Sequence, residues 1–351
     1  MATRRAFLAG LAAITLPRLS WADVGSPAYL AAGKLGDSFV LHGLSQAGQS
    51  LFRIPLPARG HAAAAHPNQP HAVAFARRPG TFALVIDCFS GTVLHQLTPP
   101  DGRQFNGHGV FSADGKWLMT SEVVATGSAG RIGVWNAETY QRTAEWDSGG
   151  IGPHDMKRLG DGRIVMANGG IQTDPNDRTK LNIPAMQPNL TLLSPDGIRL
   201  DQVQLAPELH PSSIRHLAVI GDTIAFAMQW EGDPAEAVAQ LGLWTPGSAP
   251  RLCPPPEGQT TAMQGYAGSI AATTDRIALT SPKGGVLMIF DAQGNYMATQ
   301  SRADLSGVAT GITGFVATDG QGAVWSAGDK GLTLLDRNAT LWDNHLIKIG
   351  A

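Results

Sequence analysis

Five of the ten histidines in the chain recur at one place in a repeated pattern. His108, His154 and His216 each stand six or seven residues before an Asp in a turn, and His61 and His345 fall in the same register. Neutral imidazoles that converge on one point can bind iron, copper, zinc or nickel. The register therefore predicts a transition-metal site, with iron or copper favoured. The alternative is a set of histidines that hydrogen-bond to backbone and water in a wet channel.

Other polar residues are candidates to support this site. Carboxylates and guanidinium groups beside histidines can orient them or hold an anionic ligand, and residues of the same register or on nearby loops can line the opening. The candidates for orienting the histidines or holding an anion are Asp155, Glu122 and Arg215. Those in the same register are Ser269 and Thr313, and those on the rim are Asn168, Tyr266 and Lys283.

A repeated order of short apolar segments and turns predicts the elements that position these side chains. The clearest copy has such segments at 106–111, 117–122, 131–136 and 143–146, and similar copies begin near residues 59, 153, 214, 268 and 312. Four short strands per copy are typical of the blades of a β-propeller. Because the innermost strand of each blade lines a central channel, we expect the histidines to meet at one mouth of that channel.

The two ends of the chain complete the predicted fold. Residues 29–32, 39–42 and 51–54 form three strands without an inner partner, and residues 345–349 lie where an inner strand is expected. Pairing of these segments closes the propeller and leaves no open sheet edge that would invite aggregation. We predict an all-β, seven-bladed β-propeller as a single domain over residues 23–351. A six- or eight-bladed propeller and a β-sandwich are the alternatives.

The first 22 residues have the features of an export signal. A twin-arginine pattern at residues 3–8 precedes a short apolar stretch at 9–16, and Ser20-Trp21-Ala22 has the form of a cleavage site. We expect residues 1–22 to be a twin-arginine signal peptide and the mature protein to be periplasmic. Since this route carries folded proteins, binding of a metal or cofactor before export is consistent with it.

Composition narrows the possible partners. The chain of 351 residues has 42 Gly, 23 Pro and only 15% charged residues, which favours a turn-rich β fold. Its formal net charge of −2 becomes more negative without the arginines of residues 1–22, so we do not expect nucleic acid as a partner. No apolar run beyond the N-terminus is long enough for a membrane span, so we expect no integral membrane segment in the mature chain.

Familiar motifs for cofactors and for hydrolysis are missing from the sequence. Cys88 and Cys253 lie far apart and match neither C-x-x-C nor C-x-x-C-H, which excludes covalent haem and cysteine-based zinc sites. Whether the two cysteines form a disulfide stays open. The sequence has no G-x-S-x-G or H-E-x-x-H motif, and Gly115-Lys116 is followed by Trp117 where a P-loop needs Ser or Thr.

The chain resembles an uncharacterised family of exported bacterial propellers, the domain of unknown function 1513. Beside the twin-arginine signal, the resemblance is carried by motifs that include Gly152-Pro153-His154-Asp155-Met156, Ser213-Ile214-Arg215-His216-Leu217 and Ser281-Pro282-Lys283-Gly284-Gly285. It implies a role in periplasmic iron acquisition together with imelysin-type iron-regulated proteins or a di-haem protein. It implies no catalytic residues.

Three functions are compatible with these features. The first is a periplasmic protein that binds iron or another transition metal at the histidines. The second is a metal-dependent oxidoreductase or hydrolase at the same centre, whose substrate is selected by the long segments at 168–189 and 229–239. The third is a metal-free propeller whose face binds other proteins.

Overall fold

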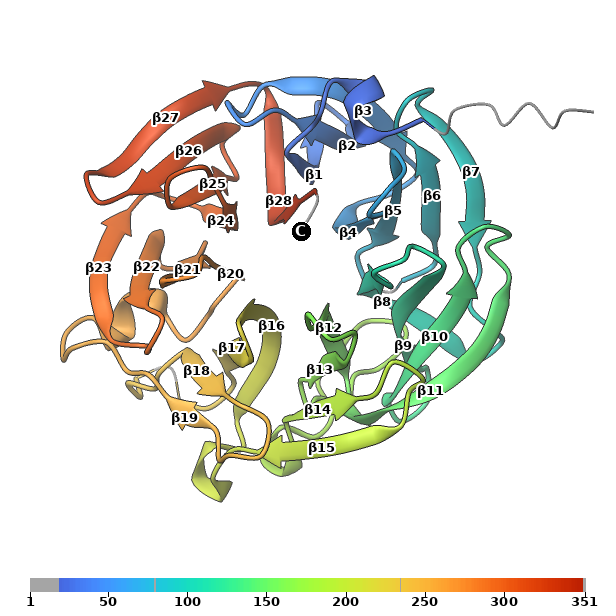
Figure 1. Ribbon diagram of the computed structural model, residues 1–351. Coiled ribbons are helices and arrows are strands. Elements are labelled where there is room, and N and C mark those ends of the chain that lie inside the picture. The colour runs from blue at the N-terminus through green and yellow to red at the C-terminus, as the bar shows by residue number, and fades with distance from the viewer. Residues whose placement is uncertain (1–18, 79, 234, 350–351) are drawn as a thin grey trace, which may run out of the picture.

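The computed structural model describes residues 19–78, 80–233 and 235–349, and these form seven four-stranded antiparallel sheets. The sheets stand as blades around a central axis, with one strand of each blade next to the axis and one at the rim (Figure 1). This is the predicted all-β, seven-bladed β-propeller. Within the described residues no helix is long and apolar enough to cross a membrane.

Blades 1 to 4 come from residues 29–204 and from the C-terminal strand. Listed from axis to rim, blade 1 contains β28 (Thr340–Lys348), β1 (Tyr29–Leu35), β2 (Ser38–Leu44) and β3 (Ser50–Leu56). Blade 2 contains β4 (Gly60–Ala65), β5 (His71–Ala76), β6 (Ala83–Asp87) and β7 (Thr92–Leu97). Blade 3 contains β8 (Arg103–Phe111), β9 (Trp117–Val124), β10 (Ala129–Asn136) and β11 (Arg142–Ile151). Blade 4 contains β12 (Pro153–Arg158), β13 (Ile164–Asn168), β14 (Asn189–Leu193) and β15 (Arg199–Gln204).

Blades 5 to 7 repeat the same order. Blade 5 contains β16 (Ser212–Ile220), β17 (Thr223–Trp230), β18 (Leu241–Trp244) and β19 (Arg251–Leu252). Blade 6 contains β20 (Ser269–Ala272), β21 (Arg276–Ser281), β22 (Val286–Asp291) and β23 (Tyr296–Ser301). Blade 7 contains β24 (Leu305–Thr310), β25 (Phe315–Asp319), β26 (Ala323–Gly328) and β27 (Gly331–Arg337). Short 3-10 turns occur at Trp21–Val24, Ile183–Ala185, Pro207–Leu209 and Thr260–Met263.

The propeller closes by pairing the two ends of the chain, as predicted. The C-terminal strand β28 pairs with β1, from Tyr29 opposite Lys348 to Leu35 opposite Thr340. Figure 1 shows the red β28 standing beside the blue β1 at the axis. The first and last segments of the described chain therefore share one sheet.

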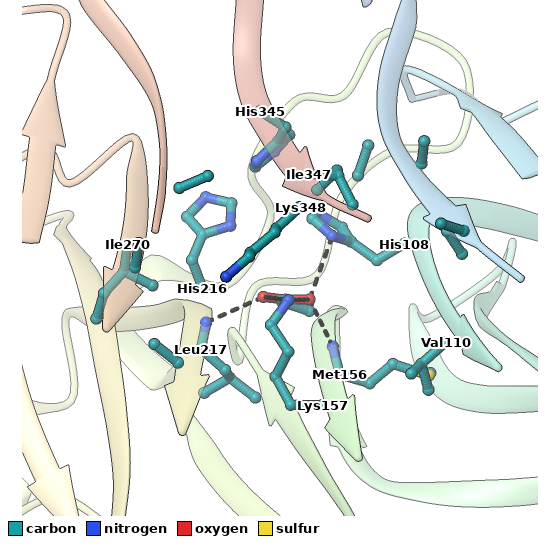
Figure 2. Close-up of a pocket in the computed structure, with 18 of the residues that line it drawn as sticks. His108, Val110, Met156, Lys157, His216, Leu217, Ile270, His345, Ile347 and Lys348 are labelled. Carbon is teal, nitrogen blue, oxygen red and sulfur yellow. Dashed lines mark hydrogen bonds and ion pairs between the residues drawn. The ribbon is translucent and has the colours of Figure 1, made fainter. Parts of the chain in front are cut away.

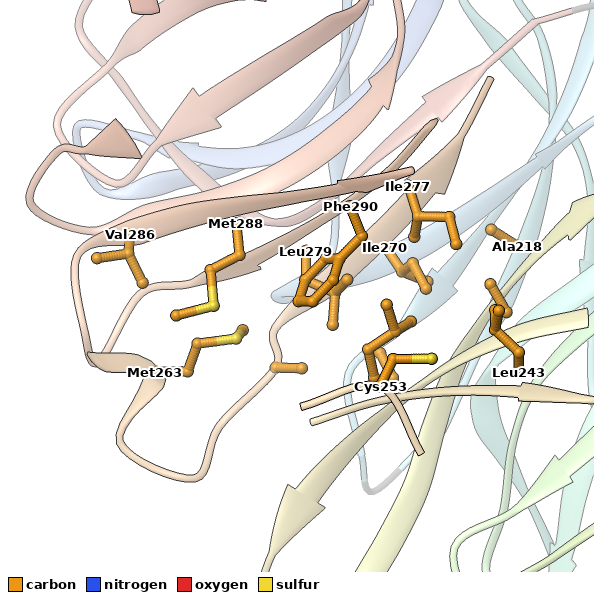
Figure 3. Packing of buried hydrophobic residues seen from close by; sticks show 14 residues of the cluster. Ala218, Leu243, Cys253, Met263, Ile270, Ile277, Leu279, Val286, Met288 and Phe290 are labelled. Carbon is orange, nitrogen blue, oxygen red and sulfur yellow. The ribbon is translucent and has the colours of Figure 1, made fainter. Parts of the chain in front are cut away.

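Apolar side chains fill the wedges between neighbouring blades. Between blades 5 and 6, Leu243 and Cys253 pack with Ile277, Leu279 and Phe290 of the next blade (Figure 3). The other clusters repeat this arrangement around the propeller. Burial of these side chains holds the sheets at a fixed spacing, and the rigid scaffold positions the residues at the axis.

The two cysteines do not form a disulfide. Both thiols are free and buried, Cys88 after β6 of blade 2 and Cys253 after β19 of blade 5. Burial raises the pKa of the Cys88 thiol to about 12. Neither cysteine is therefore a reactive thiolate.

The N-terminal prediction lies mostly outside the described residues. Residues 1–18 of the expected signal peptide are not described. The adjoining Ser20-Trp21-Ala22 segment contacts blade 2, where the Trp21 indole Nε1 donates a hydrogen bond to the His66 carbonyl at 2.8 Å.

Candidate metal centre

The histidines reach the axis through irregularities in the inner strands. His61, His108 and His154 lie within β-bulges, where two or more residues of the inner strand oppose one residue of its neighbour. His345 lies in such a bulge of β28, and His216 directly follows the bulge at Arg215. A bulge breaks the alternation of side chains and turns one of them toward a new direction. A bulge in the inner strand of each of five blades directs five imidazoles inward.

These five side chains form a closed group, here called the histidine ring. His61 is half-buried and the other four are buried. Around the axis, neighbouring imidazole centroids are separated by 4.4 Å for His345 and His61, 5.0 Å for His61 and His108, 4.7 Å for His108 and His154, 4.7 Å for His154 and His216, and 4.8 Å for His216 and His345. The histidines predicted from five separate repeats thus meet at one place.

The histidine ring contains two overlapping sets of potential ligands. One ring nitrogen each of His61, His108 and His345 lie within 4.8 Å of one another. The same is true of one ring nitrogen each of His108, His154 and His216. His108 belongs to both sets. Three buried nitrogens have no hydrogen-bond partner among the described residues, namely His61 Nδ1, His108 Nε2 and His154 Nδ1. Buried nitrogens with free lone pairs are costly unless they find a partner, and a metal ion can supply one.

The protonation state of the ring suits metal binding. Burial lowers the pKa of His216 to about 3, helped by the charge of His108. Burial and then neighbouring histidines hold the pKa of His61, His154 and His345 well below the usual range. These four imidazoles are neutral at pH 7, which is the state that binds a metal.

One buried carboxylate orients the group. Asp155 Oδ1 lies 3.4 Å from His108 Nδ1, and it also accepts a hydrogen bond from the Met156 backbone N–H at 2.9 Å. The other oxygen accepts a hydrogen bond from the Leu217 N–H of blade 5 at 3.0 Å (Figure 2). A proton on His108 Nδ1 leaves Nε2 as a free ligand, which is the usual arrangement of a carboxylate behind a metal-binding histidine.

Asp155 remains ionised in this buried position. Burial alone would raise its pKa, but the charge of Lys157 and the hydrogen bond from His108 outweigh it, and the pKa is lowered. Lys157 Nζ lies 3.0 Å from Asp155 Oδ2. The aspartate thus provides a permanent negative charge beside the histidine ring.

Close packing of the ring requires a glycine at one position. Gly107 has φ +91°, a conformation that other residues adopt rarely, and a Cβ added there would lie 2.5 Å from His61 Cδ2. The residue before His108 must therefore be small for blades 2 and 3 to approach each other at the axis.

A cavity opens on one side of the histidine ring. It has a volume of about 480 Å³ and is lined by the inner strands along the channel. His108, His216 and His345 border it, and Lys157 and Lys348 lie in the same cavity (Figure 2). A small molecule in this cavity would contact three of the five imidazoles.

Comparison with family models gives a match over residues 54–349 to the family described as proteins of unknown function, DUF1513. The chain belongs to this family. No curated protein matches it. The DUF1513 chain is similar in fold to several solved propellers, at identities that show the fold alone.

Three of these solved structures illustrate the likeness. Hydrazine synthase of Kuenenia stuttgartiensis has 12% identity and a TM-score of 0.60, with 87% of this chain and 90% of that chain covered. U3-55K has 13% identity and a TM-score of 0.59, with 80% and 82% covered. The RRP9 WD40 repeats have 14% identity and a TM-score of 0.60, with 93% and 92% covered.

Blade 7 of the DUF1513 protein differs from its predicted alignment. Thr313 does not lie at the start of an inner strand but in the exposed turn between β24 and β25. The prediction of Thr313 was made by counting back along the chain from Asp319. Asp319 ends the second strand of its blade, β25, whereas the acidic residues used in the other blades lie in the turn between the first and second strands. The bulge of β24 instead places Ser306 at the level of the ring, and Ser269 starts β20 in blade 6 as predicted.

Two further candidates lie inside blades and not at the ring. Glu122 Oε1 accepts hydrogen bonds from Arg142 at 2.6 Å and from Thr120 at 2.7 Å, so it faces outward to β11 and does not orient the histidines. The Asn168 amide bonds to Ser148 and Asn189 at the junction of blades 3 and 4. Both residues satisfy buried polar groups of the sheets.

Three candidates lie at the mouth outside the histidine ring. Arg215 is buried beside His216 on β16. Lys283 Nζ stands 4.7 Å from the centroid of the Tyr266 ring, and the Tyr266 hydroxyl accepts a hydrogen bond from Asn344 at 3.5 Å. These residues come from different blades, so the loops converge there.

Two residues that support the ring, Gly107 and Lys157, were not among those predicted from the sequence. Gly107 was part of an aligned segment, yet only the structure reveals its contact with His61. Lys157 follows Asp155 by two residues and could have been found by the strand alternation that places both side chains on one face.

Proposed function

We propose that this protein binds a transition-metal ion at the histidine ring. The observation that carries the proposal is the convergence of His61, His108, His154, His216 and His345 with three buried nitrogens left without a partner. A purely structural role would pair those nitrogens with backbone or side-chain donors, as happens for His42, whose Nδ1 and Nε2 contact Ser50 and Thr340.

The donor set indicates the class of metal. Imidazole nitrogens suit iron, copper, zinc and nickel, whereas calcium and magnesium require mostly oxygen ligands. His108 would be central, because it belongs to both ligand sets, and Asp155 would hold its free nitrogen toward the ion. We favour iron or copper as the ion.

Elemental analysis of the purified, exported protein tests this proposal. Wild-type protein is expected to contain close to one equivalent or more of iron or copper, and the His154→Ala, His216→Ala double variant is expected to lose it. His210→Ala is the matched control, because His210 is only half-buried and lies outside the ring. Equal metal content in all three proteins, or none in wild type after incubation with Fe²⁺ or Cu²⁺, would refute the proposal.

A catalytic role at the same centre is the second candidate. The cavity of about 480 Å³ gives a small molecule access to His108, His216 and His345. An ion with an open coordination position there could activate water or exchange electrons with a substrate. A change in the absorption spectrum of the loaded protein on adding a substrate, followed by turnover, would favour this candidate over a carrier.

The cellular setting is part of the proposal. The twin-arginine pattern supports export to the periplasm, and the family resemblance supports a role in iron acquisition beside imelysin-type or di-haem proteins. Replacing Arg4 and Arg5 by Lys is expected to keep the protein in the cytoplasm. Cell fractionation followed by immunoblotting would measure this, and normal export of the twin-lysine variant would contradict the assignment of the route.

A further inference from the structure

Basic side chains without a carboxylate partner gather at the mouth opposite the cavity. Three of them, Arg78, Arg178 and Arg215, are here called the arginine cluster. None has an ion pair or a side-chain hydrogen bond within the described part of the chain. They come from three blades, Arg78 after β5, Arg178 from the long loop between β13 and β14, and Arg215 from β16. Convergence of three unpaired cations calls for an explanation.

Arg215 is the most constrained member. Arg215 is only 5% exposed, and its Nε has no hydrogen-bond acceptor within the described part of the chain. The nearest acidic influence comes from Glu231, but that carboxylate is paired with Lys180. A buried guanidinium with an unused donor is strongly unfavourable unless an anion is present.

The other two arginines share a small hollow at this mouth, next to the inner strand β8. Arg78 and Arg178 line one small hollow together with Gln104 and Asn106. Burial, together with the charges of Arg215 and Arg178, lowers the pKa of Arg78 to about 9. The cluster borders the histidine ring, because Arg215 adjoins His216 on β16, and Asn106 of the hollow lies two residues before His108 on β8.

Two neighbouring arginines do form ion pairs with a buried carboxylate. Arg59 lies 2.5 Å and Arg77 3.4 Å from the carboxylate oxygens of the buried Asp343. Lys283 instead lies over the Tyr266 ring. The positive charge of the arginine cluster is therefore an excess at this site and not a general feature of the chain, whose formal net charge is −2.

We propose that the arginine cluster binds a small anion with two or more negative charges carried by carboxylate or phosphate oxygens. Guanidinium groups present paired N–H donors that match such oxygens, and several of them around one point favour multiply charged anions over single charges. The anion would occupy the mouth between the buried Arg215 and the hollow that Arg78 and Arg178 line.

The charge of a metal ion in the neighbouring histidine ring would also favour an anion in the arginine cluster. A divalent ion in the histidine ring would be surrounded by imidazoles, which carry no negative charge, and by one carboxylate, Asp155, which is already shared with Lys157. An anion in the arginine cluster would neutralise both the ion and the guanidinium groups. Only this step rests on the proposed metal function, since the unpaired arginines call for an anion with or without the ion.

Isothermal titration calorimetry on the metal-free full-length protein tests the inference. Citrate and inorganic phosphate are the probes, acetate is the singly charged comparison, and the buffer contains chloride only. We expect saturable binding of citrate or phosphate and none of acetate. Citrate alone would identify a polycarboxylate ligand, and phosphate alone would identify a phosphate ligand.

Variants separate the site from general attraction. Arg215→Gln and Arg178→Gln are expected to weaken binding at least about tenfold each, which is the usual scale for a charge-assisted pair. Arg178 is exposed on a loop, so its replacement tests the site even if Arg215→Gln fails to fold. Arg199→Gln removes the same charge from an exposed position on β15 and is expected to bind like wild type.

The outcomes distinguish this inference from the metal proposal. Metal binding is measured in parallel by elemental analysis after loading in chloride buffer. Metal uptake without any citrate or phosphate binding, in either the metal-free or the loaded protein, would overturn the arginine-cluster inference and leave the metal site intact. Anion binding without metal uptake would support the cluster and refute the metal site. Equal anion affinity in wild type and both cluster variants would also overturn the inference.

Discussion

At the scale of single residues, one aspartate organises the histidine ring. Asp155 connects His108 of blade 3 with the Leu217 backbone of blade 5, although it belongs to blade 4 itself. It therefore joins three blades at the axis and selects the tautomer of the histidine shared by both ligand sets. A neutral residue in its place could keep the backbone contact but would not favour a proton on His108 Nδ1.

Replacing Asp155 by Asn is expected to weaken metal affinity by about 10–100-fold, the usual effect of losing a partner behind a metal-binding histidine. Competition with a chromophoric chelator would measure this. Asp161→Asn is the control, because Asp161 is an exposed turn residue of the same blade that pairs with Arg163. Unchanged affinity in Asp155→Asn would show that the carboxylate does not orient His108.

Much of the site could be predicted from residue types, and the rest depended on geometry invisible in the sequence. The five histidines share a register because every blade starts its inner strand at the same end of the channel, so counting from turn residues located them. The count was wrong for Thr313, because the turn after β24 has no acidic residue and Asp319 belongs to the next turn. Glu122 was misplaced because its partner, Arg142, lies on the strand two positions further out.

At the scale of elements, the strand β28 has two functions. It supplies His345 to the ring, and its pairing with β1 closes the propeller. This closure was predictable because the first three strands lacked an inner partner. The bulges were not, since a bulge changes the strand register through backbone conformation and has no obligatory residue type. Trp342 shows how closely β28 fits, because it is 4% exposed and packs between blades 1 and 7.

The Trp342→Ala variant is expected to lose about 3–5 kcal/mol of free energy of unfolding, the range for removing a large buried aromatic side chain. Its neighbour Leu341 is 52% exposed on the opposite face of the same strand. Leu341→Ala should therefore change stability by no more than about 0.5 kcal/mol. Urea denaturation followed by tryptophan fluorescence and circular dichroism compares the two. Similar effects of both substitutions would contradict the role of Trp342 in closure.

At the scale of the whole molecule, the propeller buries several histidines in their neutral form. Burial lowers the pKa of His42 to about 4, with a further effect of Arg53, and that of His216 to about 3. In the unfolded chain these side chains take up protons near pH 6.5. The unfolded state therefore binds more protons than the folded state as the pH falls below about 6.5, and acid must destabilise the metal-free protein.

The free energy of unfolding of the metal-free protein is thus expected to be nearly constant from pH 8 to 7 and to fall between about pH 6.5 and 4. His42 alone should contribute roughly 3 kcal/mol to this loss by pH 4, because its pKa is about 6.5 in the unfolded chain and about 4 in the folded protein. Urea denaturation at intervals of one pH unit would give the slope of the free energy of unfolding against pH.

In the His42→Gln variant this slope should be shallower by about one proton between pH 6.5 and 4, whatever stability the variant loses at pH 7. His210→Gln should keep the wild-type slope. A stability that stays flat from pH 7 to 4, or an identical slope in His42→Gln, would show that the buried histidines take up protons without unfolding the propeller.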